Sequence, residues 1–178
     1  MTREDDPPRR VRLATIGHSN RPFEAFVDAL DAHGVDRVAD VRTVPRSRTV
    51  PWSSRETLAP ALERRGLAYR HDPALGGLRK PRPDSTNQAW RNAGFRGFAD
   101  PMETEAFERG LEDLLAFGDG GFAAVMCAEA VPWRCHRSLI ADALLAAGHE
   151  VIDIFDARSA KPHALASFAR VVDGRVRY

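Results

Sequence analysis

The chain has 178 residues, of which 43% are hydrophobic and 29% charged, and its formal net charge is +1. This length suits one domain with its own core, and the composition is that of an ordinary globular protein. No apolar run approaches the roughly 20 residues of a membrane-spanning helix, so we expect no membrane partner. The charged, proline-bearing start lacks an apolar signal segment, which predicts a disordered tail over 1–10, a single domain over 11–178 and a cytoplasmic location.

Positive charge is concentrated in the middle of the sequence. Residues 37–96 contain 13 Lys or Arg against 5 Asp or Glu, a local excess of +8. Such a section favours an anionic partner, either a small phosphorylated molecule or a nucleic acid. Coding bias is the alternative explanation: only Lys80 and Lys161 are lysines, so 24 of the 26 cations are arginine.

The first half of the sequence alternates strand and helix patterns. Residues 11–16 predict a buried strand, and Ser19 or Asn20 is a candidate cap for a helix that ends before Gly34. Residues 35–41, 55–65 and 67–70 predict a strand, a helix and a short strand.

Residues 71–101 are rich in Gly and Pro and show one short helical pattern, around 88–92. Long loops in compact domains are usually functional or disordered, and Trp90, Phe95 and Phe98 argue against disorder because they need burial. We therefore expect an ordered lid or excursion.

The second half predicts a helix over 103–117, a strand over 122–127, a helix over 134–147 and a strand over 150–155. The alternating run 171–176, with Asp173-Gly174 at its centre, predicts a β-hairpin. Together these elements predict an α/β domain with a mainly parallel sheet of about five strands, helices on both faces and a C-terminal hairpin.

Polar residues follow several predicted strands. Right-handed crossovers place the carboxyl ends of parallel strands along one edge, where ligands of open α/β sheets bind. The residues expected there are Gly17, His18, Ser19, Asp40, Arg42, His71, Cys127 and Glu129.

The only two cysteines, Cys127 and Cys135, flank a loop between a predicted strand and a predicted helix. In the first helical turn, Cys135 and His136 would meet unpaired N–H groups that lower a thiol pKa. Cys135 could then be a nucleophile with His136 or His18 as its base. Alternatively, the cysteines pack as small core residues.

A metal site is a further alternative. Cys127, Cys135 and His136, with a distant His18 or His71, could bind zinc or another soft metal such as iron, or the two thiols could form a redox pair. The Cys-x7-Cys-His spacing departs from the shorter cysteine spacings of standard zinc signatures, so this reading is not favoured.

Other polar residues suit an anion. Arg42, Arg46 and Arg48, with Ser47, form a basic loop whose guanidinium groups match phosphate oxygens. Backbone N–H groups at Gly76 and Gly77 could approach a ligand closely. Each feature also has a structural reading: a solvated loop, or a network in which Asp40 pairs with Arg42 or His18 and Glu129 pairs with Arg137 or Arg42.

These residues together resemble the bacterial and archaeal domain-of-unknown-function 488 family. The motifs that carry the resemblance cover the chain after residue 10: Thr15-Ile16-Gly17-His18-Ser19, Asp40-Val41-Arg42 with Pro45 and Ser47, Leu75-Gly76-Gly77, Met126-Cys127-Ala128-Glu129 with Pro132, Cys135-His136-Arg137 and Pro162-His163. The resemblance implies a compact α/β domain and a shared site, without an established biochemical role.

The favoured hypothesis is a protein that binds or processes a phosphorylated or nucleic-acid-related anion at the carboxyl edge. Arg42 and Arg137 would hold the anion, while His18, His136 or Glu129 would move protons. A Cys/His- or His/Glu-dependent hydrolase or transferase and a pure binder both remain open, as do the metal or redox module and a purely structural polar cluster. The sequence does not define the oligomeric state.

Overall fold

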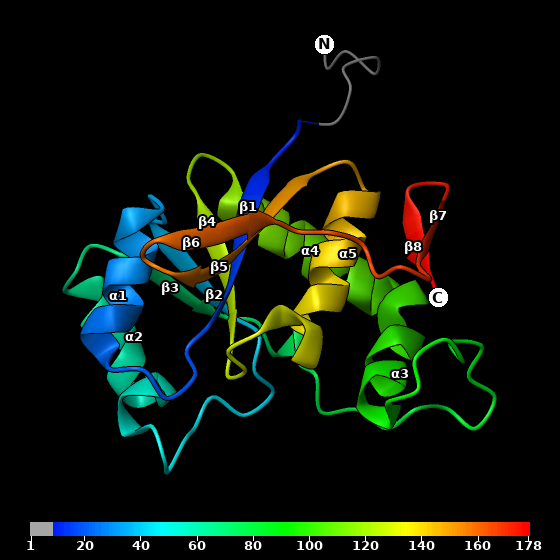
Figure 1. Ribbon diagram of the computed structural model, residues 1–178, viewed down its shortest axis with the longest axis horizontal. Helices are drawn as coiled ribbons and strands as arrows, with labels where there is room; N and C mark the ends of the chain where they lie inside the picture. Colours follow the sequence, from blue (N-terminus) through cyan, green and yellow to red (C-terminus); the bar gives the residue numbers. More distant parts are fainter. Residues whose placement is uncertain (1–8) are drawn as a thin grey trace.

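The computed structural model describes residues 9–178 and contains a six-stranded sheet, a two-stranded sheet and five α-helices in that part of the chain (Figure 1). Most of the predicted tail lies outside the described residues; Arg9 and Arg10, which are described, are exposed. The elements in chain order are β1 (Arg12–Gly17), α1 (Phe23–Ala32), β2 (Arg37–Asp40), α2 (Arg55–Glu63), β3 (Ala68–His71), α3 (Ala93–Ala99), α4 (Glu105–Gly118), β4 (Ala123–Cys127), α5 (Arg137–Ala146), β5 (Glu150–Asp156), β6 (Ser159–Pro162), β7 (Arg170–Val172) and β8 (Arg175–Arg177).

The large sheet has the strand order β3-β2-β4-β1-β5-β6. Strands β1 to β5 run parallel to one another, and β6 is antiparallel to β5. The predicted α/β fold with a mainly parallel sheet is therefore confirmed. Strand β6 was not predicted, because its short run ends in Lys161-Pro162; proline is tolerated there because β6 is an edge strand.

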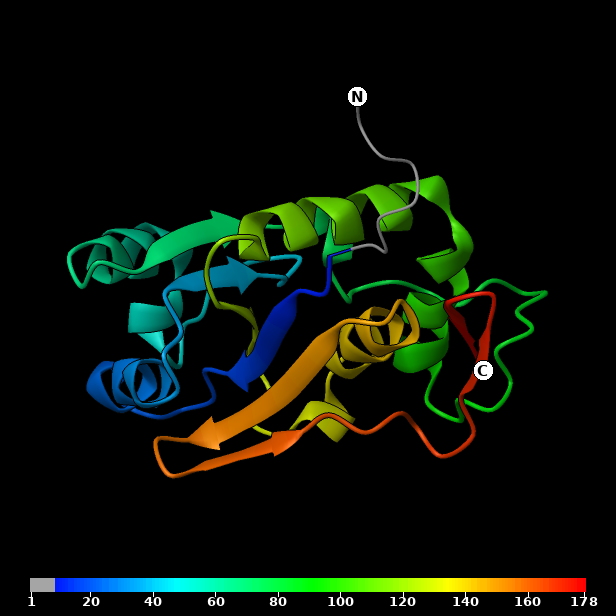
Figure 2. The same ribbon diagram turned by 90° about the horizontal axis from the view of Figure 1, so that it is seen from above.

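Helices cover both faces of the sheet, as predicted (Figure 2). On one face, Phe26 of α1 and Leu58 of α2 are fully buried against Ile16 of β1. On the other face, Leu114 of α4 and Leu139 of α5 lie in a second cluster of buried residues. This three-layer arrangement leaves the two edges of the sheet, where the strands begin and end, as the places open to a ligand.

Two helix starts differ from the predictions. Helix α1 is capped by Pro22 without a side-chain hydrogen bond, and neither Ser19 nor Asn20 caps it. Ser19 has a φ of +51° and belongs to the turn that leads the chain out of β1. Helix α5 begins at Arg137, because the turn Pro132–Arg134 and an extended Cys135 precede it.

The segment 71–101 is ordered, as expected, but its helix lies later than predicted. Instead of a turn around 88–92, α3 begins after Asn92, whose side chain accepts hydrogen bonds from the N–H groups of Gly94 and Phe95. Glycines 94 and 97 suggested a loop. Gly97 is instead needed for packing, since a Cβ there would lie 2.2 Å from the carbonyl oxygen of Arg79.

The C-terminal hairpin β7–β8 is confirmed. Asp173 and Gly174 form its turn with φ values of +50° and +72°, which is the conformation that a two-residue type I′ turn requires. Among the described residues, none of the helices combines the length and apolar character needed to cross a bilayer.

Candidate functional site

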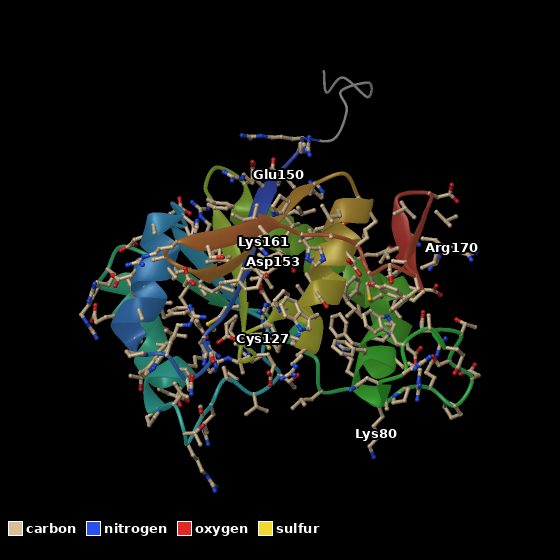
Figure 3. The ribbon with its side chains drawn as sticks, in the orientation of Figure 1. Lys80, Cys127, Glu150, Asp153, Lys161 and Arg170 are labelled. Atoms are coloured by element: carbon tan, nitrogen blue, oxygen red, sulfur yellow. The ribbon has the colours of Figure 1, made fainter. Side chains whose placement is uncertain are left out.

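A cavity of about 390 Å³ lies at the carboxyl ends of β1, β2 and β4. In Figure 3, Cys127 marks this end of the sheet, while Glu150, the first residue of β5, lies at the opposite end. The cavity is lined by His18, Arg42, Thr43, Val44, Arg46, Ser47, Gly77, Leu78, Asn92, Gly94, Phe95, Cys127, Ala128, Glu129, Arg134, Cys135 and His136. Segments far apart in the sequence therefore meet at the predicted edge.

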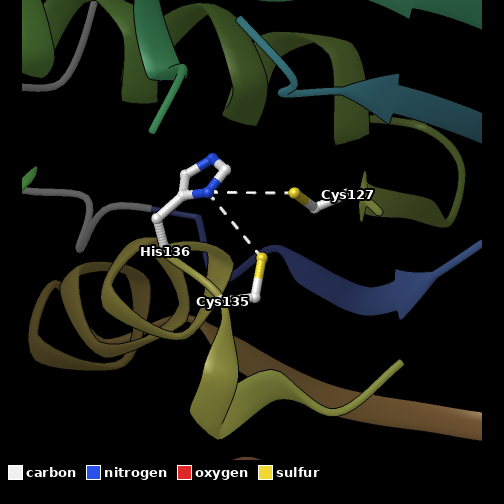
Figure 4. A group of neighbouring side chains, drawn as sticks. All are labelled: Cys127, Cys135 and His136. Atoms are coloured by element: carbon white, nitrogen blue, oxygen red, sulfur yellow. Dashed lines mark hydrogen bonds between the residues drawn. The ribbon is translucent and has the colours of Figure 1, made fainter. Parts of the chain in front are cut away.

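Two thiols and one imidazole meet on the cavity wall (Figure 4). His136 Nδ1 lies 3.8 Å from Cys127 Sγ and 3.7 Å from Cys135 Sγ. The other ring nitrogen, Nε2, donates to the backbone oxygen of Val41 at 3.2 Å. This second bond leaves Nδ1 as the ring nitrogen that faces the two sulfur atoms.

The pKa values of the two cysteine thiols are shifted in opposite directions. A hydrogen bond from Cys127, together with the neighbouring His136, lowers the pKa of Cys135 to about 4. The same hydrogen bond, with burial, raises the pKa of Cys127 well above its ordinary value. Cys135 is therefore the more acidic of the two thiols. Both cysteines are free, and both are buried apart from their contact with the cavity.

The physical cause of this activation differs from the expected one. Cys135 and His136 were predicted in the first turn of a helix, but Cys135 is extended (φ −135°, ψ 141°) and His136 is the cap of α5. Pro132 starts a short 3-10 turn and so delays the α-helix. The largest cause of the lowered pKa of Cys135 is its neighbour Cys127, rather than helical N–H groups.

Arg42 lies on the cavity wall, but its donors bind protein groups. Its Nε and Nη2 donate to the two carboxylate oxygens of Asp40 at 2.8 and 2.6 Å. Nη2 also donates to the carbonyl of Ser53 at 2.7 Å, and Nη1 to His18 Nε2 at 3.2 Å. Burial alone would lower the pKa of Arg42, but the hydrogen bonds and charge of Asp40 outweigh it and raise that pKa. Arg42 therefore forms a structural ion pair with Asp40, and its guanidinium group has little free capacity to bind an anionic ligand.

His18 is similarly engaged at both ring nitrogens. Nδ1 donates to the carbonyl of Ser19 at 2.8 Å, and Nε2 accepts from Arg42. Burial lowers the pKa of His18, so the ring is neutral near pH 7. Without a free nitrogen, His18 is poorly placed for the role of general base that the sequence suggested.

Arg137 is fully buried and does not line the cavity. Its Nη1 donates to the carbonyl of Glu129 at 2.6 Å and its Nη2 to that of Ala130 at 3.1 Å. The expected pairing with the Glu129 carboxylate is absent. Arg137 instead fixes the backbone of the loop between β4 and α5, so we no longer expect it to bind an anion.

Most of the predicted site residues line the cavity, namely His18, Arg42, Arg46, Ser47, Gly77, Cys127, Glu129, Cys135 and His136. Ser19, Asp40 and Gly76, like Arg137, do not. Asp40 lies behind Arg42, and the Gly76 N–H is used in a bond to Pro73. Gly77 contacts the triad itself, since a Cβ there would lie 2.4 Å from His136 Nδ1.

Sequence reasoning missed several lining residues. Arg134 could have been found from its position beside Cys135, but its place on the wall depends on the turn that precedes α5. Phe95 reaches the cavity from α3, an element that the sequence pattern did not predict. Leu78 follows the two glycines and is 78% exposed, and no periodicity marks it.

Cys127, Cys135 and His136 also have the chemistry of metal ligands. Their donor atoms lie within 4.8 Å of one another, and residues 9–178 contain no other such group of three. Two sulfur atoms and one imidazole nitrogen suit a thiophilic ion of the zinc type.

Comparison with known proteins agrees with the resemblance noted in the sequence. The model of a family described as "Domain of unknown function DUF488" matches residues 22–144, which include the residues of β2, β4 and the Cys135-His136-Arg137 motif. The match does not extend over Thr15–Ser19 or Pro162-His163. No curated protein and no solved structure matches the chain.

Proposed function

The chain belongs to the domain-of-unknown-function 488 family, whose description names no activity, and we propose that it binds a phosphate-bearing, nucleotide-like ligand in the cavity at the carboxyl edge. The observation that carries this proposal is the presence of two uncommitted arginines, Arg46 and Arg134, on the wall of one nucleotide-sized cavity. Cavities of roughly 300–1,000 Å³ are typical of small-molecule sites.

The guanidinium groups of these arginines are available to a ligand. Arg134 is exposed, and its guanidinium group makes no hydrogen bond or ion pair with any residue that the structure describes. Arg46 makes one long contact of 3.8 Å with the exposed Glu56, which contributes little. Glu129 is the one acidic side chain on the wall, so the uncommitted charge favours an anion. Planar guanidinium groups bind phosphate oxygens in pairs.

An apolar wall faces the same space. Val44 and Leu78 line the cavity while 59% and 78% exposed, and Phe95 lines it with its ring stacked on Trp90 at 4.7 Å. Exposed apolar side chains in a concave site suggest an apolar part of the ligand. A ligand with a phosphate and a flat ring, such as a nucleotide, fits both walls.

The test is calorimetric titration with nucleoside mono-, di- and triphosphates and with short single-stranded RNA and DNA. We expect the Arg46→Ala/Arg134→Ala variant to bind at least 10-fold more weakly, because two charge-assisted hydrogen-bond donors are lost. The matched control is Arg109→Ala, on the exposed face of α4 and outside the cavity. Glu129→Gln should bind more tightly, since it removes the negative charge from the wall.

Two results would contradict the proposal. One is that the parent protein binds no ligand of the panel, and the other is that the double arginine variant and Arg109→Ala bind with equal affinity. In either case the two arginines would have no role in holding an anion.

A further inference from the structure

We infer that Cys127 Sγ, Cys135 Sγ and His136 Nδ1 form a binding site for a thiophilic divalent cation of the zinc class, with a fourth coordination position open to the cavity. The inference rests on the geometry of these three side chains and does not depend on the nucleotide-like ligand proposed above.

The separations of the donor atoms fit a tetrahedral ion. With zinc–sulfur bonds of about 2.3 Å and zinc–nitrogen bonds of about 2.0–2.1 Å, tetrahedral geometry places sulfur roughly 3.6 Å from nitrogen. His136 Nδ1 lies 3.8 and 3.7 Å from the two sulfur atoms. Both sulfur–nitrogen separations therefore suit an ion, and all three donor atoms lie within 4.8 Å of one another.

The surroundings of His136 fix its ring for this role. A metal-bound histidine usually donates its other ring N–H to a carboxylate or a backbone carbonyl, which sets the tautomer. Here Nε2 donates to the carbonyl of Val41, and Phe98 lies beside the ring at 5.0 Å between centroids. Gly77 also leaves room for the ring, because any Cβ there would collide with it.

The backbone supports the three ligands from two elements. Cys127 ends β4, which lies between β1 and β2 in the sheet. Cys135 and His136 lead into α5 from a loop that Arg137 fastens through two carbonyl oxygens. The ligands are thus held before an ion arrives, and such preorganisation reduces the ordering cost of binding.

Three protein ligands and an accessible fourth position distinguish a reactive zinc site from a structural one, in which four protein ligands close the ion. All three residues line the cavity, and so does Glu129. The fourth position is therefore accessible to water or to a ligand in the cavity, with a carboxylate on the same wall.

The experiment uses the full-length protein purified without a histidine tag. Elemental analysis after gel filtration should find about one zinc-class ion per chain. Apo-protein made with a strong chelator should take up one Co²⁺ and show the near-ultraviolet charge-transfer absorption of thiolate–cobalt bonds. The cysteines should then react with a thiol reagent at least 10-fold more slowly than in the apo-protein.

Substitutions locate the ion. Cys135→Ser and His136→Ala should each weaken zinc binding by at least the 10- to 100-fold that even outer partners of a metal site contribute. His33→Ala, which removes an imidazole that binds the backbone of Asp156 outside the cavity, is the matched control. Circular dichroism verifies that each variant is folded. The cobalt spectrum of the parent protein tests the site even if a variant fails to fold.

The inference would be overturned if the parent protein took up neither zinc nor cobalt and both of its thiols reacted freely. Cys127 and Cys135 would then be a pair of thiols without a metal. Uptake without thiolate–cobalt absorption would also overturn it, because the ion would then lie elsewhere. Nucleotide binding is titrated separately on the apo- and metal-loaded forms. Failure of metal binding can then be distinguished from failure of nucleotide binding.

Discussion

Arg42, Arg134 and Arg137 lie at the same edge of the sheet but differ in what their guanidinium groups already contact. Arg42 binds Asp40, Ser53 and His18, and Arg137 binds two carbonyl oxygens, whereas Arg134 has no partner among the residues that the structure describes. The sequence indicated basic residues near a site. It could not distinguish committed from uncommitted donors, because that depends on acceptors supplied by distant segments.

Arg42→Ala tests the structural role of the Asp40–Arg42 pair. Both side chains are buried, with Arg42 6% and Asp40 0% exposed, so the substitution leaves an uncompensated carboxylate. We expect the free energy of unfolding to fall by about 3–5 kcal/mol, measured by urea denaturation. Arg46→Ala, at an exposed position, should change it by no more than about 0.5 kcal/mol.

The sequence hypothesis for Arg42 predicts a different result. If Arg42 were mainly an anion ligand, Arg42→Ala would lose ligand binding while its urea midpoint stayed at the parent value. That outcome would contradict the structural role of the Asp40–Arg42 pair.

His163 provides a pH-dependent contribution to stability, remote from the cavity. Its ring lies 3.0 Å from Asp142 Oδ1 and 2.8 Å from Asp153 Oδ2. Burial would lower the pKa of His163, but hydrogen bonds to the two carboxylates outweigh it and raise the pKa from 6.5 to about 9. The raised pKa means that the folded state binds the proton more tightly than the unfolded state does.

The stabilisation from His163 is therefore complete below pH 6.5 and is lost as the pH rises through about 9. We expect it to amount to roughly 3 kcal/mol, measured as the difference in unfolding free energy between pH 6 and pH 9.5. His163→Gln should reduce this difference, and His33→Gln should retain it. Equal pH dependence in the parent and His163→Gln would show that the imidazolium has no such role.

At the scale of elements, the end of β1 and the loop between β4 and α5 lie in direct contact. Gly17 allows this contact, because a Cβ there would lie 1.7 Å from the carbonyl oxygen of Glu129. His18 N–H also donates to the carbonyl of Cys127 at 2.9 Å. The loop that carries Arg134 and Cys135 is thus positioned by the strand beside it.

Gly17→Ala should displace this loop, because the collision is with backbone and not with a flexible side chain. We expect a loss of roughly 3 kcal/mol in unfolding free energy, together with weaker nucleotide binding. Gly118→Ala is the matched control, since its Cβ would meet nothing closer than a side-chain carbon at 3.3 Å. A Gly17→Ala protein as stable as Gly118→Ala would argue against tight packing of the loop on β1.

Long periodic elements were predictable and short ones were not. Leu114 and its helical neighbours marked α4, and Asp173-Gly174 marked the hairpin, because local patterns determine both. The sequence did not reveal α3, since its Gly97 serves tertiary packing, or β6, which is a short edge strand. The delayed start of α5 likewise depends on Pro132 and moves Cys135 out of the helix.

At the scale of the whole molecule, the crossovers determine which residues share the site. Strand β4 lies between β2 and β1, so the residues that follow these three strands line one cavity. The sequence predicted a common edge from strand–helix alternation, but it could not give the strand order. The hydrogen bonds between His18 and Arg42 and between His136 and Val41 follow from that order, so they could not be predicted from the sequence.

Hydrogen exchange of the full-length protein, with and without the tightest-binding nucleotide of the panel, tests most directly whether this cavity is the ligand site. We expect slower exchange in residues 43–47, 77–78 and 128–136, which contribute to its walls. Exchange in β7 and β8, at the opposite side of α5 from the sheet, should remain unchanged. Protection confined to β7, β8 and α4, with none at 128–136, would contradict the assignment of the site.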